Sequence, residues 1–170
     1  MPHTNKAPAP VSVDMAGLEG RYADRRRIDM TATTLTPHEA RAHALAEGLI
    51  EFLETSEVAD GLFAADMFCD FTMPTWRLQA CSAEESVALR LAGHPGRGMV
   101  PRWRFDPTPT GFVLEVEEAW DSGGEHWTCR ELFRADIGDE GIAQLSVYCT
   151  GDWDAARRAE HAAAVPLIRP

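Results

Sequence analysis

The sequence lacks the features that define several large classes of protein. No stretch approaches the ~20 apolar residues of a membrane span, and the N-terminus, residues 1–6, has no apolar run typical of a signal peptide. No His-x-His or His-Glu-x-x-His spacing, no Gly-x-Ser-x-Gly motif and no glycine-rich phosphate loop occurs. We therefore expect a cytoplasmic protein with no membrane partner, no metal and no other cofactor.

Cysteine spacing and net charge exclude further kinds of site and partner. The cysteines form no Cys-x-x-Cys pair, so their spacing predicts neither a zinc knuckle nor a redox pair, and all four are expected to be structural thiols: Cys69, Cys81, Cys129 and Cys149. Basic residues number 16 against 27 acidic ones, which gives a formal net charge of -11. Because such a chain is repelled by phosphate backbones, we expect no nucleic-acid partner.

Length and composition predict one compact domain. The chain has 170 residues, of which 45% are hydrophobic and 25% charged, enough for a real core. Residues 1–30 are expected to be a tail and extension, residues 31–165 the domain, and residues 166–170 a C-terminal tail. In the extension, Arg25-Arg26-Arg27 lies between acidic residues, which favours a solvated helix face or a contact with an acidic subunit over a nucleic-acid arm.

The first half of the domain carries helix signals. Thr36-Pro37-His38-Glu39 is a capping box that predicts a helix from residue 36 to about 54. A second short helix is expected over residues 58–65, and Ser82-Ala83-Glu84-Glu85 predicts a third that runs to residue 91. Between them, residues 67–72 indicate a strand that ends before Pro74.

From residue 99 onward the pattern becomes that of antiparallel strands. Aromatic and β-branched residues gather in four segments, separated by turn sequences: 99–105, 111–120, 125–135 and 142–150. Asp152 or Asp154 is then expected to cap a last short helix that ends near residue 164.

Two local motifs, together with this order of helices and strands, resemble those of a known protein family. Leu62-Phe63-Ala64-Ala65-Asp66 precedes a strand, and Leu132-Phe133-Arg134-Ala135-Asp136 precedes Gly141-Ile142 and the last strand. Over residues 36–153 the chain resembles the nuclear transport factor 2-like (SnoaL-like) superfamily. The resemblance implies an α+β fold: a cone-shaped, strongly curved antiparallel sheet, a kind of α+β barrel, with three N-terminal helices over its concave face and a small-molecule pocket inside. Members include isomerases, cyclases, epoxide hydrolases and binding-only scaffolds, so the fold alone does not choose a function.

One catalytic position departs from the family pattern. In ketosteroid isomerase-like members the general-base aspartate lies eight residues after the phenylalanine, directly before a proline. Here that position is Phe71, whereas Asp70 lies one residue earlier and Pro74 comes late. Because a one-residue offset turns a strand side chain to the opposite face, Asp70 faces the pocket only if a bulge restores its direction.

Two glutamates are predicted on an apolar sheet face. If residues 121–124 form the hairpin loop, Glu118 and Glu131 fall on the same, mostly apolar side of the sheet. Desolvation there raises a carboxyl pKa and makes either group a usable acid or base. Alternatively, both lie at the rim or pair with Arg102 or Arg104 on the neighbouring strand.

The sequence does not decide which side chains of the final strand point inward, because that depends on the length of the loop before the strand. The inward set is either residues 145, 147 and 149 or the polar residues 146, 148, 150 and 152, and we favour the polar set. Tyr148 then donates to a substrate oxygen, unless it is a packed residue with a satisfied hydroxyl. Because imidazole can exchange protons near neutrality, His94 and His126 are both candidate proton shuttles. Alternatively, His94 simply closes a helix and His126 falls on the polar face.

These residues define the expected function. The candidate acids and bases are Asp70, Glu118, Glu131, His94 and Tyr148. The aromatic residues expected to bind substrate are Trp76, Trp103, Trp127, Phe112 and Phe133. We therefore expect a cofactor-independent cyclase, isomerase or dehydratase, for example of secondary metabolism, which acts on a hydrophobic small metabolite. The alternative is a non-catalytic small-molecule-binding or assembly module of the same fold.

A homodimer is also expected. The opposite sheet face mixes apolar residues with both signs of charge, so a two-fold copy can match glutamate to arginine: Val113, Glu115, Glu117, Arg130, Leu132 and Arg134. The alternative is a solvated face.

Overall fold

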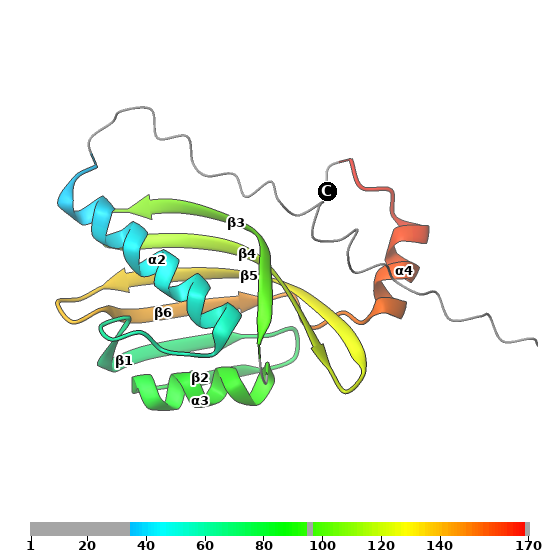
Figure 1. The fold of residues 1–170 in the computed structure, drawn as a ribbon, viewed down its shortest axis with the longest axis horizontal. Helices are drawn as coiled ribbons and strands as arrows, with labels where there is room; N and C mark the ends of the chain where they lie inside the picture. The colour runs from blue at the N-terminus through cyan, green and yellow to red at the C-terminus, as the bar shows by residue number, and fades with distance from the viewer. Residues whose placement is uncertain (1–34, 95–96, 169–170) are drawn as a thin grey trace, which may run out of the picture. The chain divides into compact units, whose positions relative to one another are not determined.

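The computed structural model describes residues 35–94 and 97–168. Three helices and six strands follow one another there (Figure 1), and all lie in one compact unit: α2 (Pro37–Thr55), β1 (Phe63–Thr72), β2 (Arg77–Ala80), α3 (Ala83–Gly93), β3 (Gly98–Thr108), β4 (Gly111–Ser122), β5 (Glu125–Ile137), β6 (Ile142–Cys149) and α4 (Ala155–Ala164). The expected extension, residues 1–30, which includes Arg25-Arg26-Arg27, lies outside the described residues. Within the described residues no helix has the length and apolar content to cross a membrane.

The six strands form one open, mixed sheet in the order β2-β1-β6-β5-β4-β3. β1 runs parallel to β6, and every other neighbouring pair is antiparallel. The prediction of a wholly antiparallel sheet is therefore wrong at one pair. A tight turn forces antiparallel pairing, but β1 and β6 are far apart in the sequence, so no turn fixes their relative direction.

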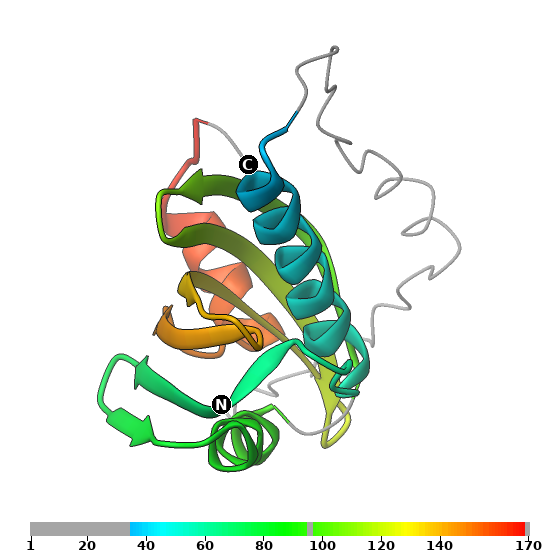
Figure 2. The ribbon, with the colours of Figure 1, turned by 90° about the vertical axis from the view of Figure 1, so that its left-hand side faces the viewer.

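Helices α2 and α3 cover the same, concave face of the sheet, which we call the inner face (Figures 1 and 2). α2 packs on β3 and β4, and α3 packs on β1 and β2. The buried side of α2 contributes Ala42, Leu49 and Leu53 to a core that includes Leu114 and Phe133 of the sheet. The opposite, outer face carries Glu115 and Glu117 of β4 and Arg130 and Arg134 of β5.

The capping box of α2 forms as predicted. The Thr36 hydroxyl accepts a hydrogen bond from the Glu39 N–H at 3.2 Å, and the Glu39 carboxylate accepts one from the Thr36 N–H at 2.8 Å. The helix expected over residues 58–65 is absent. Instead Gly61 takes a left-handed φ of 74° and the Leu62 carbonyl accepts from the Ile142 N–H at 2.9 Å, which draws this segment into the sheet as β1.

The helix arrangement consequently differs from the expectation. In the described residues two helices precede the strands β3 to β6, and they alternate with β1 and β2 rather than forming a block of three. Strand β2 was not indicated by the sequence pattern, since it is only four residues long and pairs solely with β1.

The β4–β5 hairpin turn is tighter than expected. Ser122 pairs with Glu125, which leaves a two-residue loop of Gly123 and Gly124 with φ values of 64° and 80°. Glycine adopts both left-handed conformations without steric cost. Because the register differs from the expected one by two residues, each side chain keeps its face, and the prediction that Glu118 and Glu131 point to the apolar side is confirmed.

Candidate functional site

Arg90 and His94 reach the inner face from the end of α3. The helix begins after Ser82, whose hydroxyl accepts a hydrogen bond from the Glu85 N–H at 3.1 Å. It ends at His94, whose N–H donates to the Arg90 carbonyl at 2.9 Å. Residues four apart lie on the same side of a helix, so both side chains approach β4 and β5 together.

The Arg90 guanidinium bridges two glutamates of the sheet. Nη2 donates to Oε2 of Glu118 on β4, and Nη1 donates to Oε2 of Glu131 on β5 at 3.2 Å. Glu118 pairs with Cys129 and Glu131 pairs with Val116, so the two carboxylates are diagonal neighbours on one face. The side chains of Arg90, Glu118 and Glu131 are 12%, 4% and 0% exposed.

His94 connects this ion pair to the surface. Its ring stacks on Trp120 with the centroids 4.2 Å apart. Nε2 lies 3.2 Å from Oδ1 of Asp152, and Nδ1 lies 3.7 Å from Oε2 of Glu118. Exposure falls from 39% at Asp152 to 10% at His94 and 4% at Glu118, so the residues form a path from solvent to the interior. We call Arg90, His94, Glu118, Glu131 and Asp152 the inner cluster.

The titrating groups of the inner cluster have different pKa shifts. Burial raises the pKa of both glutamates, but for Glu118 the His94 ring and the Arg90 charge outweigh burial and lower it. For Glu131, burial and the charge of Glu118 outweigh Arg90, and its pKa rises well above the usual value. Burial lowers the pKa of His94, but the hydrogen bond with Asp152 and the contact with Glu118 outweigh it and raise the pKa.

Three polar atoms of the inner cluster are buried without a hydrogen-bond partner: Nδ1 of His94, Oε1 of Glu118 and Oε1 of Glu131. Across the described residues, one further side-chain atom, Nε of Arg158, shares this state. Buried polar atoms are nearly always hydrogen-bonded, because an unpaired one costs about 1–3 kcal/mol. The three atoms therefore mark a place where a ligand with polar groups gains interactions that the protein itself does not supply.

The same neighbourhood has donor atoms of the kinds that metals bind. His94, Glu118, Cys129 and Glu131 offer one such atom each, all within 4.8 Å of one another. Arg90 already places a permanent cation against both carboxylates, however, and a divalent ion there would be repelled by it at short range. We therefore describe the site as an ion-pair cluster rather than as a metal centre.

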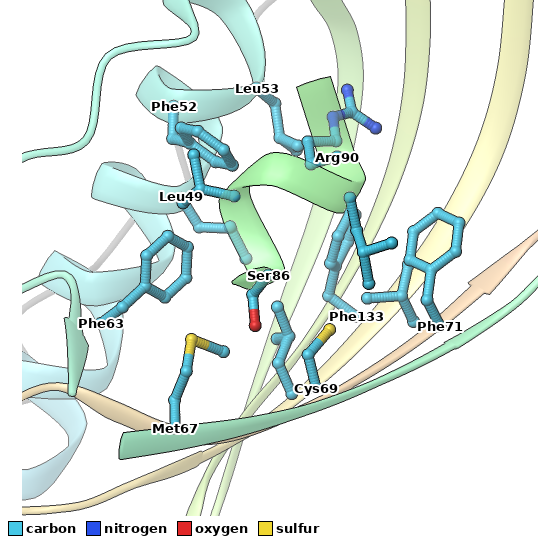
Figure 3. Close-up of a pocket in the computed structure, with 14 residues that line it drawn as sticks. Leu49, Phe52, Leu53, Phe63, Met67, Cys69, Phe71, Ser86, Arg90 and Phe133 are labelled. Atoms are coloured by element: carbon cyan, nitrogen blue, oxygen red, sulfur yellow. The ribbon is translucent and has the colours of Figure 1, made fainter. Parts of the chain in front are cut away.

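A small apolar cavity adjoins the inner cluster at Arg90 (Figure 3). Its volume is about 30 Å³, which is room for about two water molecules. Figure 3 shows Phe63 and Met67 on one side, Phe71 on the other and Arg90 at the margin. The cavity is smaller than the enclosed pocket that the sequence predicts, because large side chains from α2, β1 and β5 fill the space over the inner face.

The structure brings together three of the five predicted catalytic residues, Glu118, Glu131 and His94. Asp70 is not among them: it lies on the outer face, where Arg77 donates to its carboxylate at 2.9 and 2.5 Å. From Phe68 to Thr72 the pairing of β1 is regular, so no bulge turns Asp70 inward.

The prediction for the final strand is wrong. Val147 pairs with Phe133 and Cys149 pairs with Glu131, so the apolar set of β6 faces inward. Tyr148 points outward and is 57% exposed, on the opposite side of the sheet from the inner cluster. The four-residue segment between β5 and β6, with Gly141 at a φ of 146°, sets this parity, and its geometry is not readable from residue types.

The five predicted substrate-binding aromatics are dispersed. Phe133 lines the cavity, Phe112 is fully buried in the core, and Trp103 packs against that core. Trp127 lies half-buried beside the β4–β5 turn, and Trp76 is 67% exposed between β1 and β2. Only Phe133 among them is therefore placed to touch a ligand in this cavity.

Sequence reasoning missed Arg90, the cation that completes the cluster, whereas Asp152 belongs to the polar set that was predicted to face inward. Arg102 and Arg104 lie on the outer face, where they form ion pairs with Glu117 and Asp106 respectively. Glu118 and Glu131 pair with Arg90 instead. The signal for Arg90 is its four-residue spacing from His94 on a capped helix. Of the two candidate caps of α4, Asp154 is the one that forms: its carboxylate accepts a hydrogen bond from the Arg157 N–H at 2.6 Å.

The remaining histidine of the strands is not part of this site. His126 lies on the outer face at the β4–β5 turn, where Nδ1 is 2.8 Å from Oδ1 of Asp121. Both side chains are open to solvent, so this contact is a surface interaction.

Comparison with known proteins identifies the architecture. The sequence matches no protein-family model and no curated protein. Among solved structures, a nuclear transport factor 2-like protein from Anabaena variabilis superposes with a TM-score of 0.58 at 17% identity, covering 71% of this chain and 96% of that chain. A phenazine biosynthesis-related protein from Pseudomonas aeruginosa has a TM-score of 0.49 at 13% identity, covering 82% and 94%. At these identities the likeness concerns the fold.

Proposed function

From the premise that this chain has the nuclear transport factor 2-like fold, we propose that it is a cofactor-independent enzyme that moves protons on a hydrophobic small molecule. The reaction centre in this proposal is the inner cluster. The observation that carries it is the set of three buried, unpaired atoms on His94, Glu118 and Glu131. A substrate oxygen and an acidic C–H group would supply the missing partners.

The pKa shifts suggest a division of roles between acid and base. Glu131, whose pKa is raised, holds a proton that it can donate to a substrate oxygen. The pKa of His94 is raised, which makes it the stronger base, and its Nδ1 has no hydrogen-bond partner, with Oε2 of Glu118 3.7 Å away. Donor atoms of His94 and Glu131 lie within 4.8 Å of each other, so both can face one reacting group. Glu118 and Glu131, whose pKa values shift in opposite directions, show the separation of protonation states that is typical of acid–base sites.

Arg90 and Glu118 have supporting roles in this proposal. Arg90 lies between the cluster and the apolar cavity, where its charge stabilises an enolate-like oxygen as negative charge develops. Glu118 stays ionised and keeps His94 and Arg90 in place. The substrate would combine one carbonyl or hydroxyl group with an apolar body, and the lining side chains of the 30 Å³ cavity must move aside to admit it.

The small cavity favours the alternative, a non-catalytic binding or assembly module. If the side chains that line the cavity never move apart to admit a ligand, the inner cluster serves only to hold α3 on the sheet. The two functions differ in whether protons leave a bound ligand.

Proton exchange tests the choice. The protein would be incubated in D₂O with a panel of apolar cyclic ketones, beginning with 2-tetralone, and α-deuteration followed by NMR. We expect saturable exchange above the buffer rate, and a decrease of about 10²–10⁴-fold in His94→Gln or Glu131→Gln. Glu117→Gln, on the outer face, is the matched control and should exchange like the parent. Binding reported by Trp120 fluorescence without exchange would establish the module; neither binding nor exchange across the panel contradicts both.

A homodimer across the outer face also remains a proposal. Leu132 is 38% exposed at the centre of this face, between the charges of Arg130 and Arg134. Light scattering at micromolar concentration should give twice the chain mass, and Leu132→Glu should reduce it to one. A parent protein that is monomeric at low salt contradicts the dimer.

A further inference from the structure

Two cysteines that are twenty residues apart in the sequence meet on the inner face. Cys129 lies on β5 and Cys149 ends β6, and Cys149 pairs with Glu131, two residues from Cys129 on the same face. Their sulfur atoms and a carboxylate oxygen of Asp152 all lie within 4.8 Å of one another. Both thiols are free, Cys129 buried and Cys149 half-buried. The spacing in the sequence gave no sign of this pair, because it arises from strand register.

The two thiols are chemically unequal. The Gly151 N–H donates to Sγ of Cys149 at 3.3 Å. The hydrogen bond with Cys129, together with that from Gly151, outweighs burial and lowers the pKa of Cys149. The same interaction with Cys149, and burial, raise the pKa of Cys129. The half-exposed sulfur therefore carries the thiolate and the buried one keeps its proton, which is the arrangement of an attacking and a resolving thiol.

We propose that Cys129 and Cys149 form a redox-active pair that peroxide oxidises to a disulfide between β5 and β6. This inference is independent of the proposed acid–base function.

The reaction takes place in two balanced steps. The Cys149 thiolate attacks one oxygen of hydrogen peroxide, the O–O bond breaks, and hydroxide leaves and takes up a proton to become water. The resulting sulfenic acid is then attacked by the sulfur of Cys129: the S–S bond forms, the S–O bond breaks, and a second water leaves with the Cys129 proton. The two thiols lose two electrons in total, and peroxide is reduced to two waters.

Formation of the bond depends on the local backbone. A disulfide needs Cα atoms about 4.4–6.8 Å apart, whereas diagonal neighbours of a regular ladder are about 7–8 Å apart, so bond formation requires the backbone at this point to move. At this point the β5–β6 ladder is irregular: the Arg130 N–H donates to the Thr150 hydroxyl at 3.1 Å rather than to a carbonyl. Gly151 then takes a left-handed φ of 84°. The irregularity is local, because the Thr150 N–H still donates to the Arg130 carbonyl at 3.0 Å and Thr128 and Trp153 exchange hydrogen bonds beyond it. The movement needed for the disulfide would therefore fall on the backbone around Cys149.

The pair also touches the inner cluster, since Cys129 offers its sulfur within 4.8 Å of His94, Glu118 and Glu131. Bond formation would draw the Cys129 sulfur toward β6 and away from these groups. Oxidation is thus expected to alter their environment without any change of fold.

Mass spectrometry of the full chain tests the pair. The reduced protein would be treated with one equivalent of hydrogen peroxide, denatured, alkylated with N-ethylmaleimide and digested with trypsin. Cleavage after Arg104, Arg130, Arg134 and Arg157 places the two cysteines in separate peptides, 105–130 and 135–157. We expect these peptides to be joined, with Cys69 and Cys81 still alkylated. Joining should be about tenfold faster than oxidation of Cys81, an exposed thiol with an ordinary environment.

Variants separate the steps. Cys129→Ser should leave a Cys149 sulfenic acid that dimedone traps, and Cys149→Ser should leave Cys129 alkylated. Cys81→Ser is the matched control and should form the disulfide normally. Peptides 105–130 and 135–157 that stay separate after peroxide treatment of the parent protein overturn the proposal, whatever the variants do. So does stoichiometric zinc released when the native thiols are alkylated, because a metal ion would then be what holds the two sulfurs.

Discussion

Two arginines of this protein each contact two glutamates. One of these arginine–glutamate groups lies on the inner face of the sheet and the other on its outer face. On the inner face Arg90 bridges Glu118 and Glu131 and is 12% exposed. On the outer face Arg130 lies 2.5 Å from Glu115 and 3.9 Å from Glu117 and is 61% exposed. The charges and residue types are the same, but water surrounds only the second group. Burial, not pairing, therefore separates a group that can perturb pKa values from one that is ordinary surface.

Removal of the inner arginine should have the largest effect. Arg90→Met keeps much of the side-chain volume but leaves Glu118 and Glu131 buried without a cation. We expect a loss of about 3–5 kcal/mol in the free energy of unfolding at pH 7, measured by urea denaturation. The loss should shrink toward pH 4, where protonation neutralises the carboxyls. A loss below about 1 kcal/mol, as expected for a surface pair, would mean that the inner cluster is hydrated.

The two inner glutamates should respond to pH in opposite ways. The pKa of Glu118 is lowered, so its contribution to stability is present above its usual pKa of 4.5 and is lost as pH falls below it. Glu118→Gln should therefore cost about 1.5–3 kcal/mol at pH 7, and less at pH 4.

For Glu131 the sign is reversed. Its folded pKa is raised above 4.5, so its contribution is complete below that pH and is lost as pH rises toward the folded value. Glu131→Gln mimics the protonated form. The free energy of unfolding of the variant should therefore increase relative to that of the parent between pH 5 and pH 8. His94 also has a raised pKa and lies within 4.8 Å of Glu131, so the comparison is made in a His94→Gln background. Equal slopes for the parent and Glu131→Gln would show that Glu131 is ionised throughout.

The outer pair should give the smallest effect. Arg130→Met removes the partner of Glu115 and Glu117 where water can replace it, and we expect a change of about 0–1 kcal/mol that disappears in 1 M salt. A double-mutant cycle with Glu115→Gln measures the coupling directly. If it equals the coupling of Arg90 with Glu118, the contrast between the two faces is refuted.

Local sequence patterns predicted the parts of the site that depend on one element or one hairpin. The capping box fixed the start of α2, and strand alternation placed Glu118 and Glu131 on the buried face even though the turn is two residues tighter than expected. The parity of β6 was predicted wrongly, because it depends on the backbone path between β5 and β6 rather than on residue types.

By itself, the sequence determined the alternation of faces in β4 and β5, the helix caps and an acidic surface, since periodicity and capping act within a few residues. Only the tertiary structure decided that Arg90 joins the two glutamates, that Asp152 holds His94, that β1 runs beside β6, and that Cys129 meets Cys149. Each of these contacts joins different elements of the fold. Their geometry follows from how α3 docks and how the strands align, and those depend on the packing of the whole core.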